Sequence, residues 1–402
     1  MKSEPKSEHL ITIKNLIFKY SKKQKFDDVN IGELTINKNE IICLLGPSGS
    51  GKTTLLNLIL GFIKPTSGEI KIKNNPSIHE VSYIMQENSV YENTTVFNNV
   101  YLSAKNYDKW VNSVRVEFFQ NYIIKNNLND QKIIKLFDDY KKSIHSLNKS
   151  KIKINYLKLI FSLLFNKHVK NKFKFLKEVK LKNLFKIEIE KIAKKLDIDQ
   201  LLYKNVNELS GGQKQRVAFA KGIIKKTNLI LMDEPFSALD AKIKESTIQW
   251  LIKVKREFNL SLIIVTHDQQ DALKISDQII LLNKGEIQQY SSGNEMYDNP
   301  NNLFVAKFIG YPEINYIGIK DDKHYYIRHN KIEIQPDING KYKIIDRKNL
   351  GDKTLYTIDY SNDNNWSVLI SENNIEIGSS VNIKYSNNDV LIFDDKGNRV
   401  YE

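Results

Sequence analysis

The 402-residue sequence predicts an α/β domain built on a parallel sheet, followed by a small all-β domain. Apolar runs at residues 41–45 and 229–232, and the run at residues 260–265, which is apolar except for Ser261, are typical of central parallel strands, which are buried on both faces. A glycine-rich turn follows the first run, and carboxylates follow the second. Beyond residue 310 the pattern changes to short alternating strands separated by Asn-Gly and similar turns, which favours a small β-barrel.

The turn after the first strand, at residues 46–54, reads G-P-S-G-S-G-K-T-T. It matches G-x-x-x-x-G-K-[ST], a loop whose backbone N–H groups converge on phosphate oxygens. Its glycines permit close approach, and a helix beginning near Lys52 turns its N-terminal dipole to the same anion. Lys52 is expected to reach the β- and γ-phosphates, and Thr53 to give its hydroxyl to magnesium. The predicted ATP-binding loop consists of Gly46, Pro47, Ser48, Gly49, Ser50, Gly51, Lys52, Thr53 and Thr54.

Carboxylates stand at the tip of the second predicted strand. Asp233 is expected to bind magnesium directly or through water, and Glu234 to accept a proton from the attacking water. Taken alone, Asp-Glu-Pro is an ordinary strand-end turn, but its place after the phosphate loop favours catalysis. His267 follows the third predicted strand and is expected to contact the γ-phosphate, although a histidine at a strand end is more often structural.

The run L-S-G-G-Q-K-Q-R at residues 209–216 is the most specific motif of the chain. Ser210 is suited to cap the following helix, and Gly211 and Gly212 expose amide donors to an anion. With this run the chain resembles the ATP-binding cassette (ABC) ATPases. The resemblance implies an α/β P-loop NTPase fold with a helical subdomain, working as a two-fold head-to-tail dimer. It also implies that the ATP of the opposite subunit is bound by Ser210, Gly211, Gly212 and Gln213.

The same resemblance implies further roles. Gln86 would contact magnesium and sense the membrane partner, Asp240 would communicate across the dimer, and Tyr20 would stack on adenine. Tyr20 is equally well explained by packing at the end of an N-terminal strand. The implied cofactors are ATP and Mg²⁺, with the metal held by Thr53, Gln86 and Asp233. The implied catalytic set is Glu234, His267, Lys52 and Gln86.

Length and composition limit the architecture and the compartment. A chain of 402 residues is expected to hold two domains or three. The single Cys43 lies in the first core strand, so disulfides are excluded and a reducing compartment is expected. The polar N-terminus lacks a secretory signal, and no apolar run approaches the roughly 20 residues that span a bilayer. We therefore expect a peripheral protein at the cytoplasmic face of the membrane, with any pore formed by other chains.

The net charge of +14 is concentrated in one segment. Residues 141–195 hold 17 lysines and three acids, a difference equal to the net charge of the whole chain. Apolar residues recur there at helical spacing without glycine or proline, which predicts helices inserted into the helical subdomain at about residues 105–198. Three interpretations of residues 141–195 stay open: solvated helices, contact with anionic lipid, and nucleic-acid binding, against which the absence of arginine counts.

The region after the cassette resembles importer ATPases of the maltose, glycerol-phosphate and polyamine group. The similarity lies in the junction at residues 285–310, in Tyr-Ile-Arg at 326–328 and in the ending at 390–400. In that group the tail is an OB-type (TOBE-like) barrel that contacts its twin and can bind regulators. The predicted domains are therefore an ABC ATPase domain at residues 8–292 and a C-terminal regulatory and dimerisation domain at residues 293–402.

The function implied by this resemblance is ATP hydrolysis coupled to solute import. F-I-G-Y-P-E-I-N at residues 308–315 favours a sugar, polyol or glycerol-phosphate, whereas the phosphate loop and L-G-F at residues 60–62 favour a polyamine such as spermidine or putrescine. We prefer the sugar or polyol branch. The implied partners are a second copy or close paralogue, two transmembrane permease subunits and, indirectly, an extracytoplasmic solute-binding protein.

Two rival classes of function compete with import. A soluble cassette protein acting on ribosomes or DNA would usually join two cassettes or carry a long coiled coil, and the sequence has one cassette without sustained heptads. A purely regulatory binding module is disfavoured because the hydrolytic motifs are intact. One local departure from the family is Asn39, which stands where a glycine is usual but tolerates left-handed dihedrals.

Overall fold

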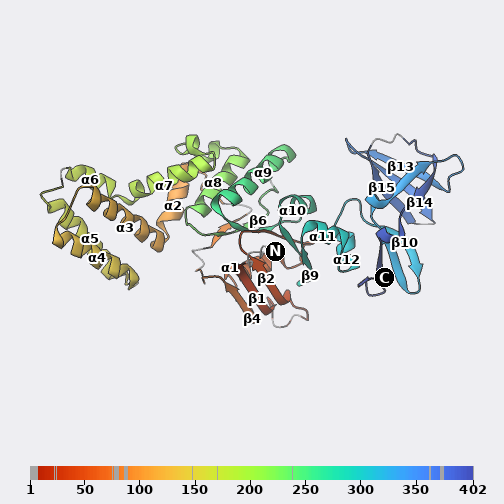
Figure 1. Ribbon diagram of the computed structural model, residues 1–402, viewed down its shortest axis with the longest axis horizontal. Coiled ribbons are helices and arrows are strands. Elements are labelled where there is room, and N and C mark those ends of the chain that lie inside the picture. The colour runs from red at the N-terminus through yellow and green to blue at the C-terminus, as the bar shows by residue number, and fades with distance from the viewer. Residues whose placement is uncertain are drawn as a thin grey trace, which may run out of the picture. The chain divides into compact units, whose positions relative to one another are not determined.

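The computed structural model describes residues 8–21, 23, 25–74, 76, 81–85, 89–146, 148–169, 171–237, 239–361, 364–371 and 375–401 (Figure 1). The chain forms two compact units. The first combines residues 1–72 with residues 263–402, and the second comprises residues 73–262. The predicted boundary between an ATPase domain and a C-terminal domain at residues 292 and 293 stays a prediction.

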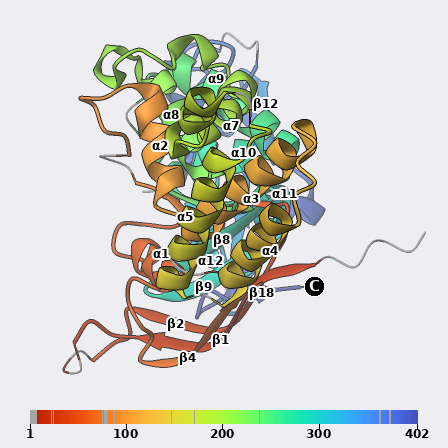
Figure 2. The same ribbon diagram turned by 90° about the vertical axis from the view of Figure 1, so that its left-hand side faces the viewer.

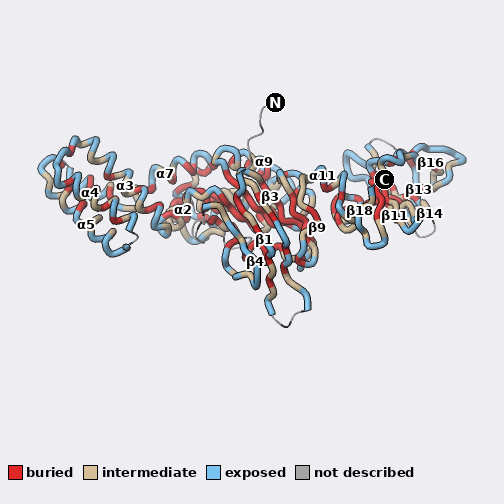
Figure 3. The backbone as a smooth tube through the Cα atoms, turned by 60° about the horizontal axis from the view of Figure 1, so that its bottom comes forward, coloured by how far each residue is buried: buried red, intermediate tan, exposed pale blue. Residues whose placement is uncertain are grey.

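The first unit contains the strand that precedes the phosphate loop. β3 (Ile41–Leu45) pairs in parallel with β8 (Gln278–Asn283), which pairs antiparallel with β9 (Glu286–Ser291). Every residue of β3 is buried, as its apolar sequence predicts, and this includes Cys43 (Figure 3). Asn39 just before β3 has a φ of 61°, so the left-handed conformation expected for this asparagine is confirmed.

A second sheet of this unit is antiparallel. Its strand order is β2 (Val29–Asn37), β1 (His9–Phe18) and β4 (Ser67–Ile72). The helices of this part are short: α1 (Lys52–Leu60) follows the phosphate loop, and α10 (Gln269–Ile275), α11 (Gly293–Asp298) and α12 (Leu303–Phe308) come later in the chain. The helix α1 ends at Gly61, whose φ of 73° and lack of a Cβ suit a left-handed C-cap.

The end of the first unit is all-β, as predicted. One sheet has the order β10 (Asn315–Lys320), β11 (Lys323–Ile327), β17 (Val390–Asp394) and β18 (Arg399–Val400). The other has the order β12 (Glu333–Pro336), β16 (Ser380–Lys384), β13 (Tyr342–Asn349), β14 (Thr354–Ser361) and β15 (Asn364–Ile370). Trp366 of β15 is fully buried in the hydrophobic core of this region. This core is consistent with the predicted OB-type domain. Single 3₁₀ turns are η3 (His329–Lys331) and η4 (Asn387–Asp389).

The second unit carries the strand that ends in carboxylates. β6 (Leu229–Asp233) pairs in parallel with β5 (Ser82–Ile84). Around this pair the chain forms α2 (Val96–Lys105), α8 (Gly211–Ile223) and α9 (Ala241–Phe258), with 3₁₀ turns η1 (Asp199–Leu201) and η2 (Val206–Glu208). The strand β7 (Ser261–Val265) spans the division between the units.

The lysine-rich insertion is helical, as predicted. It consists of α3 (Asp108–Lys125), α4 (Gln131–His145), α5 (Lys149–Phe165), α6 (Lys172–Glu178) and α7 (Leu181–Lys195). The helices α3 to α6 and their connections pack around a hydrophobic core of their own. The buried members of this core are Phe119, Leu128, Ile133, Phe137, Tyr140, Leu159, Leu163, Val169, Phe175 and Val179. The insertion is therefore a packed helical bundle, and most of its described lysines are exposed.

None of the helices in the described part of the chain is both long enough and apolar enough to span a membrane.

Candidate functional site

The phosphate loop of the first unit has the backbone that its glycines were expected to permit. Gly46, Gly49 and Gly51 have φ values of 150°, 75° and 99°. A Cβ at Gly46 would lie 2.2 Å from the carbonyl oxygen of Leu282, and one at Gly51 would lie 2.8 Å from that of Asp28. Both distances are too short for any side chain, so the loop requires glycine at these positions.

Lys52 begins the helix α1 and is almost fully buried, with 8% of its surface exposed. Its Nζ donates hydrogen bonds to the carbonyl oxygens of Gly46 at 2.8 Å and of Pro47 at 2.9 Å. The ammonium is thereby held inside the curve of the loop, whereas Thr53 at the next position is exposed. The Ser50 hydroxyl is buried and lacks a hydrogen-bond partner among the described residues. A buried unpaired hydroxyl costs on the order of 1–3 kcal/mol, and a phosphate oxygen is a suitable acceptor for it.

Tyr20 lies beside the phosphate loop within the same unit. Its hydroxyl is 3.3 Å from Thr54 Oγ1, and its backbone N–H donates to Asp28 at 2.8 Å. Phe18 contacts its ring edge-to-face at a centroid distance of 4.9 Å, and the side chain remains 62% exposed. The ring is therefore positioned by packing and is also accessible, so the adenine-stacking role stays a prediction.

His267 follows β7, also within the first unit. The backbone N–H of Thr266 donates to the carbonyl oxygen of Leu44 at 3.2 Å, so His267 lies at the same end of β3 as the phosphate loop. It is exposed, and the next residue, Asp268, caps α10 by accepting from the N–H groups of Gln270 and Asp271. The turn that carries His267 is thus held by its neighbours, which leaves the imidazole on the surface.

In the second unit, the carboxylates end β6 as expected. The half-buried Asp233 accepts a hydrogen bond from the Tyr83 hydroxyl at 3.4 Å. Burial and the nearby Asp233 carboxylate raise the pKa of Tyr83 to about 12, so this hydroxyl keeps its proton. Glu234 has a φ of 43°, which is uncommon outside glycine, and the Ser237 hydroxyl donates to its carbonyl oxygen at 3.0 Å.

A side chain from another part of the sequence also binds the turn after Glu234. The side-chain amide of Gln215 donates to the carbonyl oxygen of Pro235. Neither this contact nor that of Tyr83 with Asp233 was predicted from the sequence. Their partners lie 20 and 150 residues away, so no local pattern could have indicated them.

The signature motif begins the helix α8 with a capping box. The N–H of Gln213 donates to Ser210 Oγ at 3.4 Å, and the N–H of Ser210 donates to Gln213 Oε1 at 3.1 Å. The capping role predicted for Ser210 is confirmed. The Gln213 side chain therefore caps the start of α8, in addition to its predicted contact with ATP.

The two glycines of the signature pack closely against the start of α9. A Cβ at Gly211 would lie 3.2 Å from Leu239 Cδ2, and one at Gly212 would lie 3.4 Å from Ile243 Cγ2. Asp240 caps α9 by accepting from the N–H of Ile243 at 3.0 Å and is exposed. The second unit therefore brings the beginnings of α8 and α9 together, with Ser210 and Asp240 both on the surface.

The predicted site residues are distributed between the two units. The phosphate loop, Tyr20 and His267 belong to the first unit, and Asp233, Glu234, Asp240 and the signature belong to the second. Gln86 lies outside the described residues. In the described part of the chain, no three His, Cys, Asp or Glu side chains form a metal-binding group.

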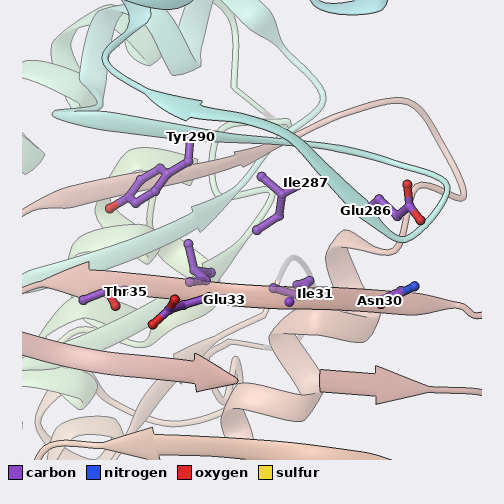
Figure 4. Close-up of a pocket in the computed structure, with 9 residues that line it drawn as sticks. Asn30, Ile31, Glu33, Thr35, Glu286, Ile287 and Tyr290 are labelled. Carbon is purple, nitrogen blue, oxygen red and sulfur yellow. The ribbon is translucent and has the colours of Figure 1, made fainter. Parts of the chain in front are cut away.

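A separate groove of about 640 Å³ lies in the first unit (Figure 4). Ile287 and Tyr290 of β9 lie across from residues 30–35 of β2. Burial and the nearby Glu40 raise the pKa of Tyr290 to about 12. No residue of the phosphate loop lines this groove, so we do not assign the nucleotide to it.

Known proteins are similar to this chain over most of its length. A family model described as ABC transporter matches residues 29–237. The spermidine/putrescine import ATP-binding protein PotA of Mycoplasmopsis synoviae (strain 53) is 33% identical over 346 residues, which cover 79% of this chain and 74% of that protein. The protein of the same name from Mesoplasma florum is 30% identical over 345 residues, which cover 86% of this chain and 75% of that protein.

A solved structure described as an ATP-binding cassette of an ABC transporter is 18% identical, with a TM-score of 0.48, over 74% of this chain and 98% of that chain. The resemblance inferred from the motifs is confirmed by the family match, as is the predicted cassette fold. Because the family model spans just over half of the chain and a relative at 33% identity covers 79% of it, the chain belongs to the ABC transporter family.

Proposed function

We propose that this protein binds and hydrolyses MgATP as one half of a cassette dimer that drives the import of a polyamine. The observation that carries this proposal is the similarity to two import ATP-binding proteins, each named for spermidine and putrescine, over 79% and 86% of the chain. The sugar or polyol solute preferred from the sequence receives no support from these relatives. We therefore prefer a polyamine as the imported solute.

ATP binding is assigned to the phosphate loop. The buried Lys52 ammonium lies between two loop carbonyls, at the edge of the loop where it would neutralise charge on the β- and γ-phosphates. The loop N–H groups and the start of α1 add partial positive charge at the same place. Thr53 and Asp233 supply hard oxygen ligands of the type that Mg²⁺ prefers, and bound Mg²⁺ would neutralise phosphate charge during cleavage.

Hydrolysis is assigned to Glu234 and His267. Glu234 would take the proton of the attacking water, and the exposed imidazole of His267 would donate to the γ-phosphate. The exposed Ser210 and the N–H groups at the start of α8 form a surface anion site of the kind that a second copy could offer to this ATP. The two active sites would then form only in the dimer, at the cytoplasmic face of the membrane, where two permease subunits supply the pore.

The solute assignment is tested by stimulation of ATP hydrolysis. The protein is reconstituted in vesicles with its permeases and its solute-binding protein, and ATPase activity is measured with spermidine, putrescine, maltose or glycerol 3-phosphate. We expect stimulation by a polyamine only. Stimulation by the sugar or by glycerol phosphate alone would contradict the polyamine assignment and leave the ATPase assignment intact.

ATP binding is tested separately on the purified chain. We expect Lys52→Ala to abolish nucleotide binding at ATP concentrations that saturate the wild type. The matched control is Lys71→Ala in the same unit, because Lys71 is exposed and pairs with Glu69 at 2.7 Å. An unchanged affinity in Lys52→Ala would refute the role of the phosphate loop.

A further inference from the structure

The helix α5 of the insertion has apolar side chains on two opposite sides. One side, with Leu159 and Leu163, is fully buried in the core of the bundle. The other side carries Ile154, Leu157, Phe161 and Phe165, which are 52%, 42%, 57% and 79% exposed. We call these four residues the α5 stripe. At about 100° per residue they fall within a sector of about 80°, so they form one continuous exposed row about 16 Å long.

The α5 stripe is part of an open groove. The helices α4 and α5 pack side by side (Figure 2). Together they form a depression of about 760 Å³. The stripe lines the groove together with Leu136 of α4, and the charged side chains at its margin include Lys132, Lys158 and Asp130. Exposed large apolar side chains gathered in one place are uncommon on a soluble surface and indicate a binding site.

The charge around the stripe is strongly positive. Residues 149–177 contain nine lysines and no acidic residue. On α5 itself, Lys151 and Lys158 flank the stripe on one side and Lys153 flanks it on the other, and all three are exposed. Asp130, the one acidic residue among the described residues that line the groove, caps α4 and accepts a hydrogen bond from Asn166 at 3.1 Å.

We infer that the α4–α5 face binds an anionic lipid surface, with the α5 stripe entering the boundary between headgroups and acyl chains. A row of aliphatic and aromatic side chains flanked by lysines is the pattern of a helix that lies in the membrane interface. The lysines can keep their ammonium groups at the level of the phosphates while their stems lie on apolar surface. A nucleic acid would satisfy the lysines, but it would leave Ile154 and Leu157 exposed without a base-stacking role.

The inference is independent of the solute and of ATP hydrolysis, so it is tested on the purified full chain. Binding to vesicles of phosphatidylcholine alone is compared with binding to vesicles that also contain phosphatidylglycerol. We expect binding to the anionic vesicles only, and we expect it to weaken as salt is raised from low to physiological concentration, because lysine attraction decays within the Debye length.

Two variants separate the apolar part from the charged part. Phe161→Ser with Phe165→Ser should lower the partition coefficient at least about tenfold, since two aromatic side chains no longer leave water. Its control is Ile187→Ser, which removes an exposed apolar side chain of α7 outside the groove and should bind as the wild type does. Lys151, Lys153 and Lys158 changed together to Gln should strongly reduce the preference for anionic vesicles. The charge-matched control changes three exposed lysines outside the insertion to Gln, namely Lys253, Lys320 and Lys343.

A direct measurement shows whether the stripe enters the bilayer. Phe165→Trp is expected to give a blue-shifted fluorescence component that is quenched by brominated lipid in anionic vesicles, and Ile187→Trp is not. Wild-type affinity in the Phe161→Ser, Phe165→Ser variant, equal binding to neutral and anionic vesicles, or the absence of quenching at residue 165 would each overturn the inference. The folding of every variant is checked by its circular dichroism and by its ATP affinity.

Discussion

His329 is expected to make the stability of the C-terminal part strongly dependent on pH. The side chain is buried, with 8% of its surface exposed, and its Nδ1 lacks a hydrogen-bond partner among the described residues. Its Nε2 lies 3.4 Å from the hydroxyl of Tyr297. Burial, followed by the positive charges of Arg328 and Lys353, lowers the pKa of His329 from 6.5 to about 4. The folded protein therefore keeps this imidazole neutral at pH values where the unfolded chain protonates it.

The direction and the size of the change in the free energy of unfolding follow from this difference in pKa. Because the pKa is lowered on folding, the unfolded state binds more protons between pH 6.5 and pH 4, and the free energy of unfolding falls as the pH falls through this window. At about 1.4 kcal/mol per pH unit, the full loss is about 3 kcal/mol below pH 4, and about 2 kcal/mol of it is already lost at pH 5.

The assay is urea unfolding of the full chain, followed by tryptophan fluorescence between pH 7.5 and pH 5. In His329→Asn we expect the free energy of unfolding to fall by about 2 kcal/mol less over this range than in the wild type. The control is His145→Asn, which removes an exposed histidine of α4. Parallel pH curves for the wild type and His329→Asn would refute the reasoning, because they would show that His329 is protonated equally in both states.

Three further predictions concern the nucleotide machinery. Glu234→Gln should keep ATP affinity but slow turnover at least about a hundredfold, measured as phosphate release in the reconstituted transporter, and near-normal turnover would exclude Glu234 as the base. Gly46→Ala should lose ATP affinity and lower the melting temperature, because its Cβ would lie 2.2 Å from the Leu282 carbonyl oxygen; a wild-type melting curve with normal affinity would mean that the loop can adapt. Mixing Ser210→Arg chains with Lys52→Ala chains should partly restore ATP-induced dimerisation, since one of the two sites in the mixed dimer is intact. A failure to complement would indicate that the signature acts within its own chain.

Local sequence was sufficient for the elements whose geometry depends on neighbouring residues. The apolar run of β3, the glycines of the phosphate loop and the start of α1 at Lys52 were all predicted, because strand burial and loop dihedrals are properties of a few consecutive residues. The same holds for the Ser210 cap, whose partner Gln213 is three positions away. The helices of the lysine-rich insertion were predicted from apolar spacing and from the absence of glycine and proline.

Contacts between distant residues could only come from the tertiary structure. Tyr83 reaches Asp233 because β5 and β6 pair in parallel, and the signature glycines meet Leu239 and Ile243 because α8 and α9 begin side by side. The sequence of α5 shows apolar residues on two sides but does not tell which side the bundle core covers. The packing of α3, α4 and α6 buries Leu159 and Leu163 and leaves the α5 stripe exposed. Sequence by itself thus determined the phosphate and signature motifs, because their chemistry is local. Only the fold decided which apolar face of the insertion is free to bind, because burial depends on neighbours far along the chain.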